Sequence, residues 1–295
     1  MTISDSKPSP LEPQYLQSMW DFSNPVVSCQ RFEEFALRAL EAGQPILAAL
    51  AQTQQARALG LSRLFDQGFA LLNAILITHP SPACELAVRL KLERGRLLNS
   101  SGDPTLSASE FVHAWDIARS SHLDGLAVDA AHMLGIVLSG QDSKQWNHLA
   151  MELAIESDQE DAKKWRGSLL NNMAWTEHDE GNHQQALILF ERALEVRLES
   201  ESLPQIRIAR WSIGRCLRSL ARFDEAIEIQ QQLETDPEAD GYVHEELGEC
   251  YHALGFTEKA GPYFAKAHQM LSADPWLVAN ESSRLQRIKK LSSVE

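Results

Sequence analysis

Five histidine and carboxylate side chains are the residues best suited to acid–base chemistry. They are His132, His178, Asp179, Glu245 and Glu249. A carboxylate beside a histidine shifts the pKa of both groups, and such a pair can move a proton during a reaction. If the fold gathered all five, they would form the site of a small-molecule- or metal-dependent enzyme. Because no nucleophile or metal-ligand set accompanies them, catalysis is the alternative and binding is the main interpretation.

The short motifs that mark common enzymes do not occur in the chain. It has no Gly-Lys-Ser/Thr of a nucleotide-binding loop, no dinucleotide-binding glycine pattern and no serine-hydrolase elbow. His244 and Glu245 begin like a zinc-protease helix, but Gly248 stands where the second histidine is required. His178 and His183 lack a third ligand at a suitable spacing. The sequence therefore predicts no catalytic residue, no metal site and no cofactor.

The net charge of the chain limits the kinds of partner that it can bind. The chain has 295 residues, of which 44% are hydrophobic, with 41 Asp and Glu against 27 Lys and Arg and a net charge of -14. Such a negative chain repels nucleic-acid backbones and anionic lipid headgroups. The apolar run that ends at Ile77 is too short to span a bilayer. We therefore expect a protein or peptide partner, and no nucleic acid or membrane.

The N-terminus and the cysteines indicate the compartment. Residues 1–27 begin with a polar stretch rich in proline and serine and carry no apolar signal segment, which predicts a disordered or loosely anchored tail. No two of the four cysteines form a Cys-x-x-Cys pair, and we interpret them as buried thiols in a reducing compartment. The predicted location is the cytoplasm. The cysteines are Cys29, Cys84, Cys216 and Cys250.

A repeated spacing of small residues predicts the elements that position these side chains. At six places a small residue is followed 19 positions later by another small or apolar one. The pairs are Ala56 and Ile75, Gly95 and Ala114, Gly135 and Ala154, Ala174 and Ala193, Gly214 and Leu233, and Gly248 and Ala267. Antiparallel helices approach closely only where side chains are small, so the spacing predicts six helical hairpins.

The hairpins are expected at residues 45–79, 82–121, 123–158, 161–201, 203–236 and 238–273. A lone helix is expected before them at 28–42, and a last helix at 276–292 would cap the stack with an apolar stripe. Prolines fall at the expected junctions, where the missing N–H matters least. These prolines are Pro45, Pro80, Pro82, Pro104, Pro204 and Pro237.

The last hairpin resembles the tetratricopeptide repeat position by position. The matching residues are Leu247, Gly248, Tyr251, Ala260, Phe264 and Ala267. The resemblance covers residues 45–275, and the upstream repeat of about 40 residues is similar to the long-helix style of kinesin light chains. Through the segments 20–25, 171–175, 208–211 and 240–246, the whole chain also resembles a bacterial group of long-helix tetratricopeptide proteins.

The resemblance implies an all-α, right-handed superhelix (solenoid) of about six hairpins with an N-terminal helix and a C-terminal capping helix. The expected divisions are a tail at 1–27, the solenoid at 28–275 and the cap at 276–295. In that family the first helix of each hairpin lines a concave groove. The resemblance thus implies a ligand-binding set of Arg57, Arg89, Arg96, Asn99, His132, Asn171, Trp175, His178, Trp211, Arg215, Arg218, Tyr242, Glu245 and Glu249.

This set combines arginines with flat aromatic rings. A guanidinium can bind a carboxylate with two parallel hydrogen bonds and aromatic rings can stack, so the sequence predicts a module that binds a peptide or partner segment. The arginines of the first half favour an acidic segment. The Lys-and-Asn clamp of some family members is not reproduced, because no Lys accompanies Asn171. Two alternatives stay open: the tryptophans and arginines only pack and pair within the fold, or the protein is a scaffold that acts through its outer face.

Overall fold

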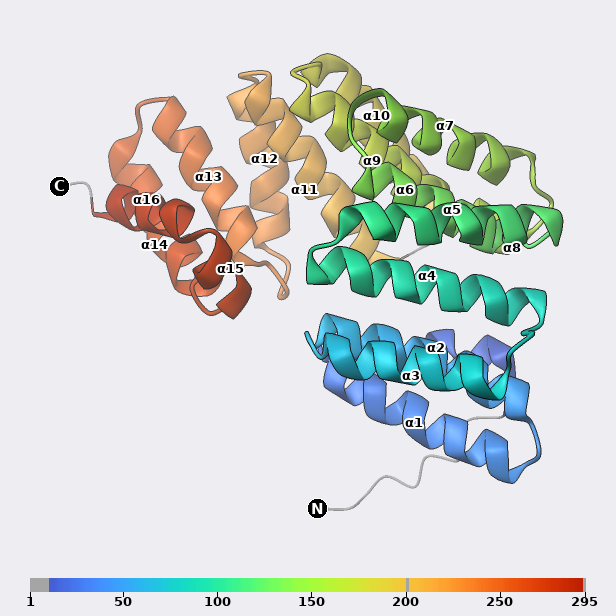
Figure 1. The fold of residues 1–295 in the computed structure, drawn as a ribbon. Helices are drawn as coiled ribbons and strands as arrows, with labels where there is room; N and C mark the ends of the chain where they lie inside the picture. The colour runs from blue at the N-terminus through green and yellow to red at the C-terminus, as the bar shows by residue number, and fades with distance from the viewer. Residues whose placement is uncertain (1–10, 200–201, 294–295) are drawn as a thin grey trace. The chain divides into compact units, whose positions relative to one another are not determined.

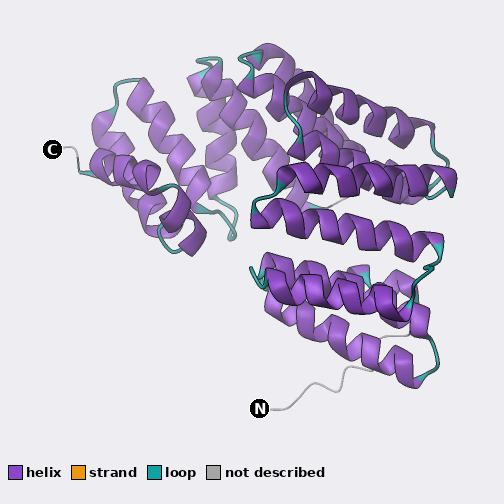
Figure 2. Ribbon diagram, viewed as in Figure 1, coloured by secondary structure: helices purple, strands orange, loops and turns teal. Residues whose placement is uncertain are grey.

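The computed structural model describes residues 11–199 and 202–293, and within those ranges every regular element is a helix (Figures 1 and 2). The chain divides into two compact units, Met1–Trp165 and Arg166–Glu295, which we call unit 1 and unit 2. The prediction of an all-α fold built from helical hairpins is confirmed. No helix in the described ranges has the length and apolar character that a membrane crossing requires.

Unit 1 begins with two short 3₁₀ turns and continues as a series of antiparallel helices. The turns are Pro13–Tyr15 and Gln17–Met19, and the helices are α1 (Pro25–Glu41), α2 (Pro45–Leu61), α3 (Phe65–Thr78), α4 (Cys84–Ser101), α5 (Pro104–Ser120), α6 (Asp124–Val137), α7 (Gly140–Glu156) and α8 (Glu160–Lys163). Each helix from α1 to α7 packs on the next, and α2 also packs on α4. The helix expected to stand alone, α1, therefore forms a hairpin with α2.

Unit 2 repeats this arrangement. Its helices are α9 (Arg166–Asp179), α10 (His183–Glu199), α11 (Leu203–Ser219), α12 (Phe223–Glu234), α13 (Gly241–Ala253), α14 (Thr257–Leu271), α15 (Pro275–Asn280) and α16 (Ser282–Ser292). The single last helix expected at 276–292 is interrupted at Glu281, and its second part, α16, packs on α14. The tail, solenoid and cap boundaries stay predictions.

Local sequence signals fix where several helices start and end. The side chains of Asn24, Asp103 and Asp240 accept hydrogen bonds from backbone N–H groups in the first turns of α1, α5 and α13. Proline occupies the first turn of α2, α5 and α11, where no hydrogen bond is lost. Gly255, just beyond α13, has a φ of 81°, a left-handed conformation that glycine adopts without strain.

In three hairpins a glycine on the first helix meets a large side chain 16 positions later: Gly95 and Phe111, Gly214 and Gln230, and Gly248 and Phe264. A Cβ on Gly95 would lie 2.5 Å from Phe111 Cε1, and one on Gly248 would lie 2.9 Å from Phe264 Cδ1. Both phenylalanines are fully buried. The predicted spacing of 19 located the hairpins correctly, but the closest contact falls about one turn earlier on the second helix.

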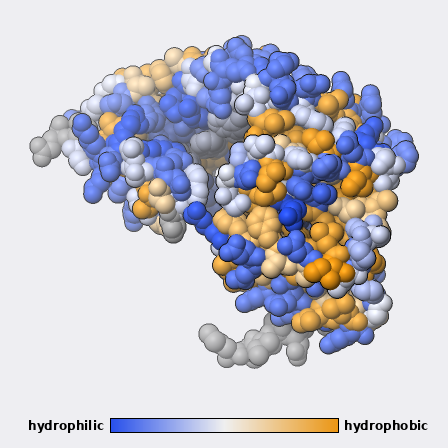
Figure 3. Space-filling model, viewed as in Figure 1, coloured by the Kyte–Doolittle hydropathy of each residue, from blue (hydrophilic) through white to orange (hydrophobic). Residues whose placement is uncertain are grey.

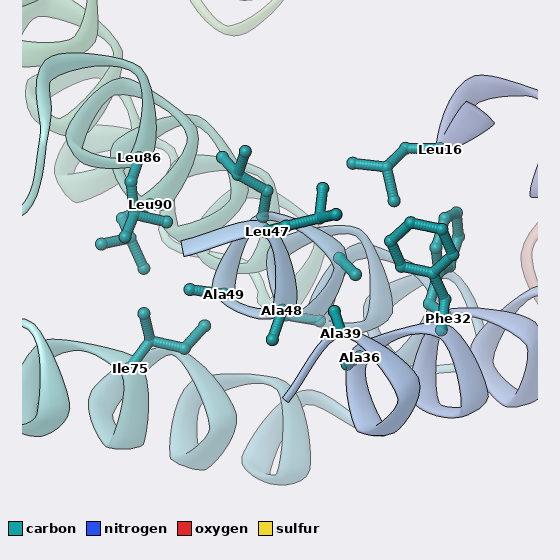
Figure 4. Close-up of a cluster of buried hydrophobic side chains, with 14 of the residues drawn as sticks. Leu16, Phe32, Ala36, Ala39, Leu47, Ala48, Ala49, Ile75, Leu86 and Leu90 are labelled. Atoms are coloured by element: carbon teal, nitrogen blue, oxygen red, sulfur yellow. The ribbon is translucent and has the colours of Figure 1, made fainter. Parts of the chain in front are cut away.

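The core of unit 1 includes part of the predicted tail. Leu16 and Met19 are buried in the same cluster as Phe32 of α1 and Ala48 of α2. Figure 4 shows Leu16 and Phe32 beside these helices, and small alanines where α1 approaches α2. The segment from residue 11 onward is therefore anchored by apolar burial, whereas residues 1–10 lie outside the described part.

The cysteines agree with the sequence interpretation at two positions and disagree at one. Cys216 and Cys250 are fully buried, and burial raises the pKa of the Cys216 thiol to about 11 and that of Cys250 to about 12. Cys29 is half-buried. The prediction was wrong for Cys84, which is exposed because it is the first residue of α4 and faces solvent there.

Candidate functional site

Three aromatic rings follow one another across three helices of unit 2. Trp175 lies on α9, Trp211 on α11 and Tyr242 on α13, and we call these three residues the aromatic ladder. The ring centroids of Trp175 and Trp211 are 6.1 Å apart, and those of Trp211 and Tyr242 are 6.0 Å apart. All three side chains are half-buried. The buried part of each ring fixes its position, and the exposed part is accessible to a ligand.

Packing within the hairpins fixes the ladder. Trp175 follows the fully buried Ala174, and its ring meets Phe190 of α10 edge-on at 4.9 Å. The Nε1 of Trp211 is buried and has no hydrogen-bond partner among the described residues. This ring therefore offers apolar surface, and not a hydrogen-bond donor, to anything that binds beside it. The alternative that the tryptophans only pack between helices therefore holds for the buried part of each ring and leaves the exposed part open to a ligand.

Beside the ladder, the arginines of α11 are held by one carboxylate of α13. Arg218 donates from Nε and Nη2 to the two oxygens of Glu246 at 2.6 and 3.0 Å, and Arg215 Nε lies 3.4 Å from the same carboxylate. Burial acts to lower the pKa of Arg218, but the hydrogen bonds to Glu246 outweigh it and raise that pKa. Both predicted groove arginines are therefore paired within the fold.

The two predicted groove carboxylates of α13 are likewise paired, with arginines of α16. Glu245 accepts hydrogen bonds from Arg284, and Glu249 accepts hydrogen bonds from Arg287. The guanidinium of Arg284 also lies 5.3 Å from the ring centroid of Tyr242. Sequence reasoning missed both arginines because it treated this helix as an apolar cap. The signal was present, since Glu245 and Glu249 are four apart on one helix and the two arginines are three apart on the other.

His178 ties α9 to the end of α11. Its Nε2 lies 2.9 Å from Ser219 Oγ, its Nδ1 lies 3.4 Å from Asp179 Oδ1, and Arg215 donates to the same serine hydroxyl at 2.6 Å. Burial lowers the pKa of His178 and favours its neutral form at pH 7. Serine, histidine and aspartate are the groups of a hydrolase triad, but the Asp179 side chain is 79% exposed and Arg215 already engages the hydroxyl. The arrangement therefore serves packing.

The residues of the alternative enzyme site are divided between the two units. His132 belongs to unit 1, and the four others belong to unit 2. Glu245 and Glu249 are occupied by the arginines of α16. Among the described residues, no three His, Cys, Asp or Glu side chains are placed to hold a metal ion.

A pocket of about 430 Å³ adjoins the ladder at Trp211 and Tyr242. It is lined by Pro204, Arg207, Ile208, Trp211, Leu233, Glu238, Ala239, Asp240, Tyr242 and Val243. These residues come from the first two turns of α11, the end of α12, the following loop and the start of α13. Sequence reasoning did not predict the pocket, although it singled out two of the segments that border it, 208–211 and 240–246.

Unit 1 carries a buried cluster of charge on α4 and α6. Arg96 donates to Glu93 at 2.7 Å and to Asp129. Burial acts to raise the pKa of Asp129, but the nearby Arg96 outweighs it and lowers that pKa. Burial lowers the pKa of His132 to about 4, and the ring centroid of His132 lies 5.0 Å from that of Trp165. The predicted groove residues Arg96 and His132 are therefore half-buried beside the buried carboxylates Glu93 and Asp129.

The other predicted groove residues differ in the contacts that their side chains make. The guanidinium of Arg57 lies 5.4 and 5.9 Å from the ring centroids of Trp20 and Phe22, and it forms no ion pair with a described residue. Arg89 pairs with a carboxylate one turn earlier on its own helix. Asn99 lies half-buried on α4, and in unit 2 Asn171 lies half-buried on α9, one turn before Trp175.

Comparisons with known proteins match one part of the chain to a known repeat family. Residues 150–235 match the sequence model of the tetratricopeptide repeat family, a span that contains α9, α10, α11 and α12. No curated protein matches the chain. The match therefore rests on the middle of the chain and includes two of the three ladder residues.

Solved structures share the fold over most of the chain. A tetratricopeptide repeat protein from Parabacteroides merdae matches with a TM-score of 0.56 and 12% identity, covering 96% of this chain and 99% of that one. The apo form of the quorum sensor NprR from B. thuringiensis matches with a TM-score of 0.58 and 13% identity, covering 95% and 85%. NprR in complex with its cognate peptide NprX gives 0.55 and 12%, covering 97% and 91%. At these identities the likeness shows the fold alone, and a shared fold does not by itself fix a function.

Proposed function

We propose that this chain, an interaction protein of tetratricopeptide type, binds an extended peptide or partner segment against the aromatic ladder of unit 2. The observation that carries the proposal is the run of three half-buried rings at centroid distances of 6.1 and 6.0 Å. An extended chain places every second side chain on the same face, about 6.6 Å apart. Successive rings of the ladder are therefore spaced to contact alternate residues of such a segment.

The ion pairs beside the ladder support peptide binding by holding its wall in place, whereas the sequence predicted that the same arginines bind the ligand directly. Because Glu246 holds both Arg215 and Arg218, these arginines stiffen the wall and keep only part of their donor capacity for a ligand. Arginine and aromatic residues are the types that dominate binding at protein interfaces. We therefore assign most of the affinity to Trp175 and Trp211, and orientation to the arginines.

The proposal can be tested with a displayed library of random 12-residue peptides. The library is selected on the full chain and counter-selected on the Trp175→Ala/Trp211→Ala variant, and affinities of the recovered peptides are measured by fluorescence anisotropy. Each single alanine variant should weaken binding at least about tenfold, because the loss of a buried aromatic anchor removes more than 1.4 kcal/mol. Trp175→Phe keeps an aromatic ring against Phe190 and should bind better than Trp175→Ala.

Trp115→Ala is the matched control. Trp115 is a half-buried tryptophan that packs edge-on against Trp146 at 5.5 Å in unit 1, and its loss should leave peptide affinity unchanged. If no peptide distinguishes the full chain from the double variant while both melt at the same temperature, the ladder is not the binding surface. Unchanged capture of one partner by both proteins would favour the alternative of a scaffold that acts through its outer face.

The predicted preference for an acidic segment rests on unit 1, where Arg57 is the favourable residue. Its guanidinium is stacked on Trp20 and Phe22 and forms no ion pair with a described carboxylate, whereas Arg96 already holds two. Replacing it in Arg57→Gln should weaken binding of acidic peptides and leave neutral ones unaffected, and equal loss for both would contradict the preference. The cytoplasm remains the proposed location.

A further inference from the structure

The pocket beside the ladder has the size and the walls of an apolar anchor site. Its volume of about 430 Å³ falls within the range of roughly 300–1,000 Å³ that is typical of ligand sites. Leu233 and Val243 form buried parts of the wall, and Ile208 is 59% exposed. Trp211 adds apolar ring surface because its Nε1 is buried. A bulky apolar side chain would therefore gain contact on several sides.

The rim of the pocket is acidic. Glu238 and Asp240 line it together with one cation, Arg207. Arg207 donates to the adjacent Asp236 at 2.9 Å and also pairs with Glu238. Three carboxylates against one guanidinium leave an excess of two negative charges. The Glu238 side chain is 71% exposed, so its field reaches solvent at the mouth. On the face that Figure 3 shows, much of the surface of unit 2 is hydrophilic.

We infer that this pocket binds a bulky apolar side chain that is adjacent to a lysine or arginine in the bound segment. The inference rests on the proposed function and narrows it, because it names the chemistry of one part of the segment. Apolar burial supplies the affinity, and the acidic rim selects the neighbouring charge. The pocket thus prefers a basic residue in the bound segment, whereas Arg57 of unit 1 is expected to prefer an acidic one.

Two small probes test the inference without a known partner. They are N-acetyl-phenylalanyl-lysine amide and N-acetyl-phenylalanyl-glutamate amide, titrated into full-length protein labelled with ¹⁵N-tryptophan. The indole signal of Trp211, assigned with the Trp211→Phe variant, should shift with the lysine probe. The lysine probe should bind about two- to fivefold more tightly than the glutamate probe at low salt, the range of an exposed ion pair, and the difference should vanish near 1 M salt.

Two substitutions separate the apolar and the charged parts of the site. Ala239→Phe places a ring in the pocket and should abolish the shift with both probes. Glu238→Lys should remove or reverse the preference for lysine. Glu258→Lys makes the same charge change on an exposed residue in the first turn of α14, beyond the end of α13 that lies away from the pocket, and should leave the preference intact.

The inference is overturned if neither probe moves the Trp211 signal, or if Glu238→Lys leaves the preference unchanged. These outcomes are distinct from failure of the proposed function. If peptides lose affinity in the Trp175→Ala variant but bind the Ala239→Phe variant normally, the pocket inference is wrong and the proposal for the ladder still holds. Probes that bind as expected while no 12-residue peptide is recovered would support the pocket and contradict the extended-segment proposal.

Discussion

The contact between Gly95 and Phe111 gives the most quantitative prediction about the fold. A methyl group added in Gly95→Ala would lie 2.5, 2.8 and 2.8 Å from three atoms of the Phe111 ring, closer than van der Waals contact permits. The ring is fully buried between α4 and α5. The two helices must therefore move apart, or the ring must leave its preferred rotamer.

The expected change is the difference between two effects. Alanine is favoured over glycine within a helix by about 0.5–1 kcal/mol, whereas overpacking a close-packed core costs about 1–3 kcal/mol. We therefore expect Gly95→Ala to lower the unfolding free energy of unit 1 by about 1–2 kcal/mol. Urea denaturation followed by circular dichroism measures this change, with separate midpoints if the units unfold separately.

Gly60→Ala is the matched control in the same unit. Its added methyl group would lie 2.6 Å from Leu97 Cδ2, but the next atom, Leu97 Cγ, is 3.8 Å away. The end of a leucine side chain can yield where a ring cannot, so we expect a change within about 0.5 kcal/mol. If the two variants are equally stable, the close approach of helices at Gly95 does not determine the hairpin geometry.

Two further predictions concern buried charge. Burial lowers the pKa of His132 to about 4, below its ordinary value of 6.5, so the unfolded chain binds the additional proton between these values. The contribution of His132 to the stability of unit 1 is therefore complete above pH 6.5 and falls with decreasing pH, by about 2 kcal/mol between pH 7 and pH 5 in urea titrations. His132→Asn should remove this part of the pH dependence of unit 1. Glu246→Gln leaves Arg215 and Arg218 without their counter-ion and should lower the stability of unit 2 by about 2 kcal/mol. The same change at the exposed Glu225 should leave the stability of unit 2 unchanged, because solvent screens that ion pair.

Each of these predictions has a result that contradicts it. A pH dependence between 7 and 5 that persists in the His132 variant would mean that another group is responsible. If Glu246→Gln and the Glu225 control lower the stability of unit 2 equally, the ion pairs that Glu246 of α13 makes with α11 behave as solvated surface ion pairs. In that case the wall beside the ladder would not be held by Glu246.

The hairpins could be predicted because they depend on local signals. A small residue recurs at a fixed spacing, and prolines mark the junctions, so the helix positions follow from single segments of sequence. The break of the last helix at Glu281 was missed, because the apolar stripe of Leu285, Ile288 and Leu291 lies wholly beyond that residue and carries no information on the residues before it. The contact of Gly95 with Phe111, 16 positions later instead of 19, depends on how far the second helix slides along the first. That displacement depends on side-chain volumes and cannot be read from spacing.

The site was predicted in part, for a physical reason. Trp175 and Trp211 were selected because a repeat position places them on one side of their helices, and the structure brings them together. Glu246 was left out, although it is the counter-ion of two predicted arginines, because ion pairing joins residues 28 positions apart and leaves no periodic signal. The pocket was missed because the loop that completes it has no repeat pattern.

The binding surface on unit 2 is tested most directly by the indole NMR signals of the ¹⁵N-tryptophan-labelled chain. They are recorded with and without a 12-residue peptide recovered from the counter-selected library. Binding along the ladder predicts that the signals of Trp175 and Trp211 shift together in proportion to occupancy, while those of Trp115 and Trp146 stay in place. Saturable binding that moves only Trp115 and Trp146, and leaves the ladder signals unchanged, would contradict the account.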